Sequence, residues 1–187
     1  MRVYSRLVRR SFKHCEPSYI HFTARIDNPE FIVLNGVNIG RHVWLYAMTT
    51  DAAGRAFSPE IVIGHGTKIG DRCHMTCATR LSIGSDVLMN QNVLVTDSVH
   101  IYEDPGLPII SQGITCRPMS IGDNCWIGNN SAIIACSVGR HCVVSANAVV
   151  LHDVPDRCMV AGVPARIVKK YDDASGKWVS VAAGDRG

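Results

Sequence analysis

Aliphatic residues recur every six positions along most of this sequence, and a glycine directly follows many of them. Four residues after most of these positions stands a small or β-branched residue, such as Val43, Cys73 or Ala148. Neither a helix, with its period of about 3.6, nor a strand, with its period of 2, maintains such a repeat. The in-register aliphatic residues are Ile39, Leu45, Ile63, Ile69, Met75, Ile83, Met89, Val95, Ile121, Ile127, Ile133, Val138, Val144 and Val150.

A period of six predicts a triangular coil in which each face is one short strand. Three faces make one turn, and successive turns stack as parallel strands through backbone hydrogen bonds. The aliphatic residues then stack inside the prism and the small residues fill its corners. The glycines occupy turns where a side chain would crowd the chain or the backbone needs a positive φ. We therefore expect an all-β protein, a parallel β-helix of hexapeptide repeats.

Three interruptions of the repeat indicate how the chain is organised. Residues 51–60 fall outside it, the step from Met75 to Ile83 is eight residues, and the longest break covers residues 98–118. Loops of that length inside a compact repeat array are uncommon and are usually either functional or disordered. We expect an N-terminal cap segment at 1–17, a β-helix at 18–160 with a protruding loop at about 98–118, and a C-terminal segment at 161–187 with a short helix or tail.

Composition narrows the classes of function. The 187-residue chain has 19 basic and 16 acidic side chains, a formal net charge of +3 and no long run of Lys or Arg, so nucleic-acid binding is not expected. No apolar stretch is long enough to span a bilayer, and the N-terminus lacks the apolar core of a signal peptide. The eight cysteines include no CxxC pair, which favours buried free thiols in a reducing, cytoplasmic compartment.

His100 lies at the mouth of the longest break and is the first candidate for catalysis. Its place in the repeat points outward, and a neutral imidazole in a surface groove is a good general base because its ordinary pKa is about 6.5. Asp97, Glu103 and Asp104 lie close by in sequence, and each is a candidate to orient the ring. From the residues alone, an ordinary surface histidine is the alternative.

Two further features of the sequence are candidates for ligand binding. Trp126 occupies an outward position, where a large aromatic ring is either a ligand platform or part of a subunit interface. Trp44 has the equivalent place in an earlier hexad, and we assign it to packing or to an oligomer contact. Basic residues follow the Gly-x-Pro turn at 162–164, where they either bind phosphate or lie on a solvated C-terminal helix.

Three motifs, in this order, resemble the hexapeptide-repeat acetyltransferases, specifically the galactoside and maltose branch and the related exopolysaccharide and O-antigen O-acetyltransferases. They are VHIYED at residues 99–104, continuing to 108–109 and 112–113, then SIGDNCWIG at 120–128 and VAGVPAR at 160–166. The resemblance covers roughly residues 33–170. It implies a left-handed β-helix and a homotrimer with active sites between neighbouring subunits.

The resemblance also implies roles for single residues. His100 matches the family's catalytic histidine, which takes a proton from a sugar hydroxyl as that hydroxyl attacks the thioester of acetyl-CoA directly. Its partner is either Asp97 or Glu103. No metal is implied. The residues that match positions along the coenzyme are Trp126 beside the CoA and acceptor groove, Asn129 and Ala146 near the pantetheine arm, and Arg166 and Lys169 near the phosphates.

Departures from the galactoside and maltose enzymes favour the polysaccharide branch, with a sugar or polysaccharide precursor as acceptor. A short stretch at 1–17 replaces their longer cap, and the turn at 135–137 is one residue shorter than is usual in the family. Apolar residues at helical spacing between Tyr4 and Phe12 alternate with basic ones. They predict either a cap on the first coil or a helix that holds residues 1–13 peripherally against an anionic membrane.

Other functions are weighed as alternatives to an acetyl-CoA-dependent O-acetyltransferase. An N-acetyltransferase acting on an amino-sugar nucleotide fits the same motifs. A non-catalytic scaffold would have no use for the long loop that carries His100. A zinc enzyme of the γ-carbonic anhydrase type shares the β-helix, but Trp126 and the motif at 161–166 favour CoA. Its potential ligands would be His65, His74, His100, His141 and His152.

Overall fold

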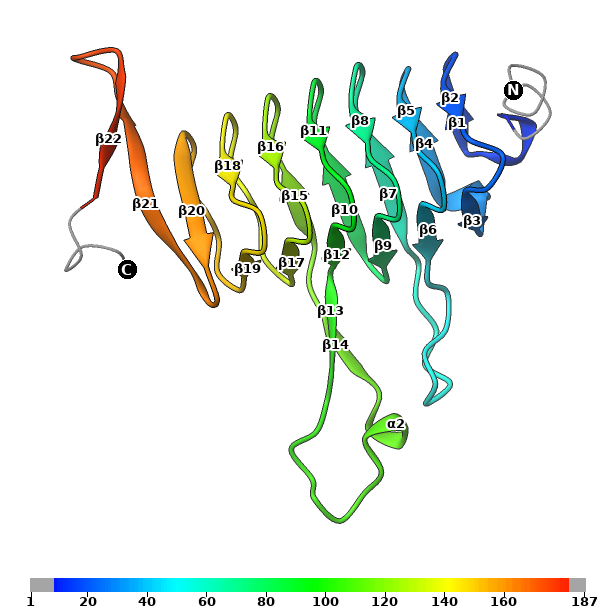
Figure 1. Cartoon of the computed structure of the whole chain (residues 1–187). Coiled ribbons are helices and arrows are strands. Elements are labelled where there is room, and N and C mark those ends of the chain that lie inside the picture. The colour runs from blue at the N-terminus through cyan, green and yellow to red at the C-terminus, as the bar shows by residue number, and fades with distance from the viewer. Residues whose placement is uncertain (1–8, 182–187) are drawn as a thin grey trace.

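The chain forms a three-sided prism of stacked coils, described for residues 9–181 by a computed structural model (Figure 1). Each coil contributes a short strand or bridge to each of three parallel stacks, which we call faces A, B and C. The predicted left-handed parallel β-helix of hexapeptide repeats is confirmed.

The strands of the three faces are short and regularly ordered. Face A consists of β1 (His14–Cys15), β4 (Ile32–Leu34), β7 (Glu60–Ile63), β10 (Arg80–Ile83) and β15 (Met119–Ile121), continued by bridges at Val138 and Val154. Face B consists of β2 (Tyr19–Ile20), β5 (Asn38–Ile39), β8 (Lys68–Ile69), β11 (Leu88–Met89), β16 (Trp126–Ile127), β18 (Val143–Val144), β20 (Cys158–Gly162), β21 (Ala165–Asp172) and β22 (Lys177–Ser180). Face C consists of β3 (Arg25–Asp27), β6 (Trp44–Ala47), β9 (His74–Cys77), β12 (Leu94–Thr96), β17 (Ala132–Ile134) and β19 (Val149–Val150).

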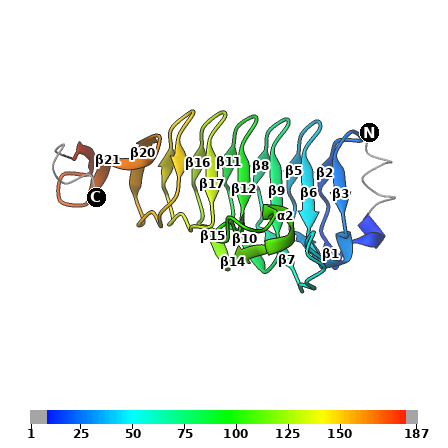
Figure 2. The same cartoon turned by 90° about the horizontal axis from the view of Figure 1, so that it is seen from below.

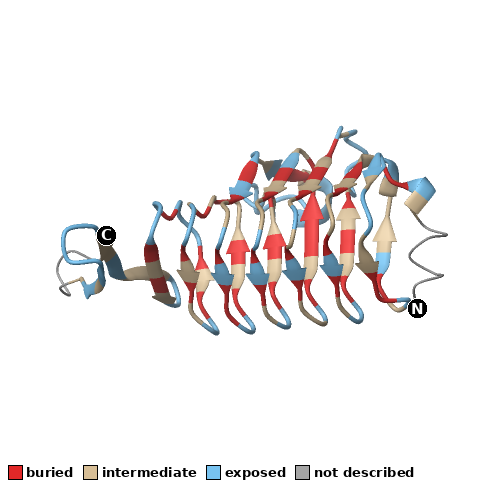
Figure 3. Cartoon of the chain, turned by 90° about the horizontal axis from the view of Figure 1, so that it is seen from above, coloured by how far each residue is buried: buried red, intermediate tan, exposed pale blue. Residues whose placement is uncertain are grey.

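The core is the column of aliphatic side chains inside the prism. Every one of the fourteen in-register aliphatic residues is at most 2% exposed. Buried and exposed positions alternate along each coil, as Figure 3 shows. Burying one such side chain contributes roughly 1.5–3 kcal/mol, so the repeat itself carries most of the stability. Of the predicted corner residues, Thr79 is the one that is not buried, because the eight-residue step before Ile83 displaces it.

Crowding explains the glycines that follow the aliphatic residues. A Cβ on Gly64 would lie 2.6 Å from a backbone carbon of Gly84 in the next coil, closer than real Cβ atoms come. Positive φ occurs elsewhere in the turns, and Asn or Asp often adopts it, as at Asn92, Asn130 and Asn147. Those three side chains form a hydrogen-bonded ladder, with amide contacts of 3.0 and 3.2 Å, that joins neighbouring coils.

All three breaks in the repeat fall at one corner of the prism, where the chain passes from face C to face A. We call it the C–A corner. Residues 48–59 form the first insertion, between β6 and β7, and residues 78–79 make a short turn in the next coil. Residues 97–118 form the second insertion, between β12 and β15. In Figure 1 both insertions descend from the same edge of the prism.

The C-terminal segment differs from the short helix or tail that we expected. It forms strands β21 and β22, which extend face B as antiparallel neighbours of β20. Tyr171 and Trp178 pack edge to face, with ring centroids 5.8 Å apart. The Asp172 carboxylate accepts the amides of Ala174 and Ser175 and so closes the hairpin turn. β-Branched residues and cross-strand aromatic packing therefore override the helical interpretation.

The predicted N-terminal helix lies mostly outside the described residues, because residues 1–8 are not described. Within the expected cap, Arg9–Ser11 form a short 3-10 helix, η1, and β1 already pairs with β4 of face A. A second such helix, η2, covers Pro29–Phe31. Between residues 9 and 181, no helix has the length and apolar character needed to cross a membrane.

Candidate active site

The second insertion carries His100 at the end of a two-stranded hairpin. Strand β13 (Ser98–His100) pairs antiparallel with β14 (Ile114–Cys116), and His100 lies opposite Ile114. The Ile101 amide donates to the carbonyl of Gly113 at 3.1 Å, which extends the pairing by one step. Beyond it the chain makes a wide excursion that includes the one-turn helix α2 (Ile109–Gln112). The excursion projects away from the prism in Figure 1, and in Figure 2, seen from below, it and α2 lie in front of the stacked coils.

A groove of about 430 Å³ lies between the hairpin and the first insertion, with face C as its floor. Its floor is rich in hydroxyl and ring groups, and the His100 side chain is exposed at one wall. The floor residues are Tyr46, Met48, His74, Thr76, Leu94 and Thr96, and the wall residues are Thr50, Asp51, Ala52, Ser98, Val99, His100 and Ile114.

Asp97 does not orient His100. Its side chain is fully buried and points into the C–A corner. Its carboxylate accepts the backbone amides of Ala78 (2.9 Å) and Thr79 (2.7 Å) and the Thr79 hydroxyl (2.8 Å). Asp97 thus fixes the short turn between β9 and β10, directly beneath the hairpin.

Glu103 is also turned to its own backbone, because its Oε2 accepts the amide of Tyr102 at 2.9 Å. Among the described residues, the ring of His100 has no hydrogen bond to Asp97 or to Glu103. The structure therefore brings neither predicted partner to the ring. His100 stands free at the groove wall, open to a hydroxyl group that enters the groove.

A stack of rings forms one end of the groove floor. Trp44 and His74 are partners in adjacent coils, and their rings are 4.2 Å apart and within 5° of parallel. Arg25 lies over the Trp44 ring at 4.5 Å. A ring nitrogen of His74 is 3.1 Å from the Thr76 hydroxyl, and burial lowers the pKa of His74 below its ordinary value. His74 is therefore neutral at physiological pH and able to exchange hydrogen bonds with a ligand.

The residues expected to bind the coenzyme lie on other parts of the prism. Trp126 is on face B, 48% exposed, between Leu88 and Val143 of neighbouring strands. Asn129 and Ala146 are exposed at the corner between faces B and C. Arg166 and Lys169 lie on β21 of the C-terminal hairpin. The C–A corner lies opposite face B, so within one chain His100 and Trp126 are on opposite sides.

The histidines considered as zinc ligands are dispersed. His74 is on face C, His100 is on the hairpin, and His65 and His141 lie in turns between faces A and B. Within residues 9–181 no three His, Cys, Asp or Glu side chains of one chain lie close enough to share a metal ion.

The sequence analysis missed the floor of the groove and the side chain that joins its walls. Tyr46, Thr76 and Thr96 occupy the same outward column on consecutive coils, directly after the buried residues Leu45, Met75 and Val95. Aligning the hexads by their buried residues would have found this column. Arg55, in the first insertion, offered no such signal, because its contact with Ile114 depends on how two loops fold.

Comparisons with known proteins agree with this architecture. The family model described as hexapeptide repeat of succinyl-transferase matches residues 118–152. The chain is 27% identical over 181 residues to WbbJ of Escherichia coli strain K12, by name a lipopolysaccharide biosynthesis O-acetyl transferase. That match covers 92% of this chain and 87% of the relative.

Two solved structures have the same fold. A mutant of AntD, an N-acyltransferase from Bacillus cereus solved with dTDP and coenzyme A, superposes with a TM-score of 0.75 at 18% identity, covering 88% of each chain. A hexapeptide-repeat-containing acetyltransferase of Vibrio cholerae, solved with acetyl coenzyme A, gives 0.58 at 24% identity and covers 90% of this chain and 76% of that one.

Stacked hexads, a histidine on a projecting hairpin and a groove beside it define a hexapeptide-repeat β-helix equipped for catalysis. Its similarity in sequence to acetyltransferases extends over nearly the whole chain. The chain carries the hexapeptide repeat, is similar to acetyltransferases over most of its length, and is an acyltransferase enzyme.

Proposed function

We propose that the chain is an O-acetyltransferase that moves an acetyl group from acetyl-CoA to a hydroxyl of a sugar or polysaccharide precursor. The observation that carries this proposal is the position of His100, exposed at the wall of a groove whose floor presents hydroxyl and ring groups. The similarity to WbbJ, named for lipopolysaccharide biosynthesis, supports the choice of acceptor.

His100 acts as the general base. One nitrogen of its neutral ring accepts the proton of the acceptor hydroxyl while the hydroxyl oxygen bonds to the thioester carbonyl carbon. The carbon–sulfur bond then breaks, and the imidazolium returns its proton to the departing thiolate of CoA. The ring of His100 is neutral again after this step, and no acyl-enzyme forms. Asp97 contributes indirectly, because it holds the corner from which the hairpin rises.

The groove floor suits a carbohydrate. Thr76 and Thr96 present hydroxyl groups, and His74 has a ring nitrogen that donates or accepts. Tyr46, whose ring stacks on Trp44 at 5.7 Å, adds an aromatic surface. Sugars carry both hydroxyl groups and apolar C–H faces, so a floor that combines both kinds of contact fits them.

Acetyl-CoA binds, we infer, between two copies of the chain. Trp126 and the C–A corner lie on opposite sides of one prism, so one chain cannot place both His100 and Trp126 against the same thioester. In a ring of copies, His100 of one copy would face Trp126, Asn129 and Ala146 of the next, with Arg166 and Lys169 near the CoA phosphates. A homotrimer is the simplest ring of this kind.

N-acetyl transfer to an amino-sugar nucleotide is the second candidate function, favoured by the shared fold with AntD. The two candidates differ in the bond formed. An acetyl ester is cleaved by neutral hydroxylamine, whereas an acetyl amide is not.

The test combines native mass spectrometry with an acceptor screen. The purified chain should form a trimer that gains acetyl-CoA, and incubation with sugars and amino-sugar nucleotides should add one acetyl mass to an acceptor. Release of that acetyl group by hydroxylamine supports the proposal, and resistance to hydroxylamine supports the N-acetyl alternative. A chain that ignores acetyl-CoA but carries stoichiometric zinc would overturn both.

A further inference from the structure

The two insertions at the C–A corner are joined by one arginine. Arg55, in the first insertion, donates from Nη2 to the main-chain carbonyl of Ile114 on β14. Ile114 is the partner of His100 in the hairpin, so this contact reaches the backbone directly opposite the candidate base. Ile114 is 6% exposed, so the accepting end of the bond is buried, while the Arg55 side chain is 44% exposed.

Arg55 is itself held rigidly by Asp51. The Asp51 side chain is 2% exposed, and one of its oxygens accepts the Arg55 Nε at 2.8 Å. The other oxygen accepts the backbone amides of Ala53 (3.0 Å) and Arg55 (2.9 Å). Burial raises the pKa of Asp51, but the hydrogen bonds and charge of Arg55 outweigh burial and hold that pKa below its ordinary value. Asp51 is therefore ionised at neutral pH and fixes the plane of the guanidinium.

Gly113 completes the arrangement from the hairpin side. Its φ is +82°, and a Cβ there would lie 2.6 Å from Nε of Arg55. The guanidinium therefore lies directly against the bare backbone of the hairpin. A branched residue at 113 would push Arg55 away from Ile114.

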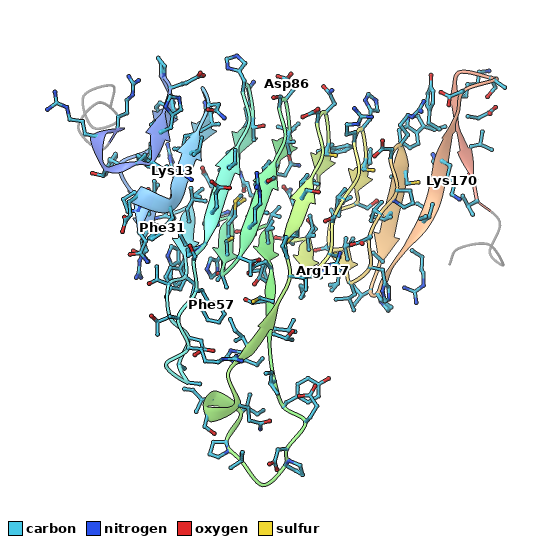
Figure 4. The ribbon with its side chains drawn as sticks, turned by 180° about the vertical axis from the view of Figure 1, so that it is seen from behind. Lys13, Phe31, Phe57, Asp86, Arg117 and Lys170 are labelled. Carbon is cyan, nitrogen blue, oxygen red and sulfur yellow. The ribbon has the colours of Figure 1, made fainter. Side chains whose placement is uncertain are left out.

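These contacts connect the two walls of the groove. Asp51 lines one wall, and His100 and Ile114 line the other. Figure 4 shows both insertions on the same edge of the prism, with Phe57 labelled on the first and Arg117 at the base of the second. The outer part of the hairpin loop, including Tyr102, Leu107 and Ile110, is exposed, and the hydrogen bonds of the Gln112 side chain stay within that loop.

We propose that Arg55 is a positioning residue for His100: it locks the first insertion to β14 and so sets the width of the groove and the place of the imidazole. This inference rests on the proposed function, because it takes His100 as the group that acts on the acceptor. A displacement of about 1 Å at a reacting group costs up to about 10²-fold in rate, so a loose hairpin would impair catalysis.

The experiment compares Arg55→Ala and Arg55→Lys with the wild-type chain. Lysine keeps the charge but cannot contact Asp51 and Ile114 at once through a rigid fork. Both variants should lower kcat by about 10–10²-fold while the KM for acetyl-CoA changes little. Their melting temperatures should stay close to that of the wild type, because the insertions lie outside the prism. The control is Arg80→Ala, which removes an exposed arginine paired with Glu60 at 3.5 Å on face A.

Hydrogen–deuterium exchange gives a second readout that does not depend on activity. Both Arg55 variants should exchange faster at residues 98–116, including the Ile101 amide, and be unchanged in the prism strands. Unchanged exchange at 98–116, or full activity of Arg55→Lys, would overturn the proposal. If the wild-type chain transfers no acetyl group, the proposed function fails on its own, and the exchange result alone decides whether Arg55 holds the hairpin.

Discussion

His100 and Asp97 are three residues apart but belong to different structural environments. Asp97 is buried and saturated with hydrogen bonds from the 78–79 turn, whereas His100 is exposed on the hairpin. The carboxylate that looks like a catalytic partner in the sequence is therefore the anchor of the corner. A catalytic histidine without a carboxylate partner in its own chain would depend on the substrate, or on a neighbouring subunit, to orient its ring.

Replacing His100 tests its role most directly. His100→Ala should lower acetyl transfer by about 10²–10⁴-fold, the usual contribution of a general base. The side chain is exposed and packs on nothing in the core, so melting temperature and acetyl-CoA binding should not change. Steady-state kinetics, a melting curve and calorimetric CoA titration measure the three quantities. Full activity in this variant would contradict general-base catalysis by His100.

His74 should make the stability of the protein depend on pH. Its folded-state pKa is lowered by burial, so the folded chain binds fewer protons than the unfolded chain below the ordinary pKa of about 6.5. Stability from this residue is therefore complete above that pH and is lost as pH falls through 6.5 toward the folded pKa.

Melting temperatures of wild type and His74→Gln between pH 5 and 8 measure this effect. Glutamine does not titrate, so the difference between the two proteins should shift in favour of His74→Gln as the solution is acidified. A difference that stays constant over this range would contradict a lowered pKa at His74.

At the level of single residues, strand alternation explains which assignments the sequence supports. Val95 points inward, so Thr96 points outward and Asp97 points inward again. Strict alternation along the strand therefore predicts that the Asp97 side chain is buried. The same count directs Tyr46 and Thr76 outward from the core, where both line the groove floor and Thr76 is largely covered. The fourteen aliphatic positions needed only the period of six, and all of them are buried, whereas core residues such as Ile20, Leu34 and Ile61 were not among them.

At the level of elements, the placement of both insertions at one corner creates the site. The sequence shows the breaks at 51–60 and 98–118 but not that they face each other, because this depends on each break following a face C strand. The C-terminal hairpin was missed for a related reason. The motif at 160–166 continues the family pattern, but pairing of β21 with β20 and β22 is a long-range choice that residue spacing does not reveal.

The stacking of coils makes the glycines of the repeat sensitive to any side chain. Gly64→Ala should destabilise the protein by at least about 1–3 kcal/mol, the usual cost of overpacking, because the new methyl would overlap backbone atoms of Gly84 and Ser85. Gly106→Ala is the matched control, since a Cβ there meets just one side-chain oxygen of Asp104, at 3.1 Å. Thermal unfolding followed by circular dichroism compares the two. Equal melting temperatures would contradict tight coil stacking at Gly64.

At the level of the whole molecule, a three-sided prism separates the residues matched to catalysis from those matched to the coenzyme. His100 rises from the C–A corner and Trp126 stands on the opposite face, 48% exposed beside Leu88, which is 47% exposed. A large exposed aromatic and a neighbouring leucine are expected to be covered by a ligand or by another subunit. If copies of the chain form a ring in which each interface holds one coenzyme, Trp126 and Leu88 are covered and His100 of a neighbouring copy is brought to the coenzyme.

Mixed oligomers distinguish a shared site from one within a single chain. Chains carrying His100→Ala and chains carrying Trp126→Ala, each with a different affinity tag, are co-expressed, and mixed assemblies are purified through both tags. Alone, each variant should be impaired. Every mixed trimer has a single interface, out of its three, that combines an intact His100 from one chain with an intact Trp126 from another, so activity should return to roughly a third of the wild-type value. Mixing His100→Ala with the double variant restores no complete interface and serves as the control.

Activity that does not exceed the average of the two single variants would mean that His100 and Trp126 do not meet across an interface. The coenzyme would then have to lie on face C beside His100 of the same chain.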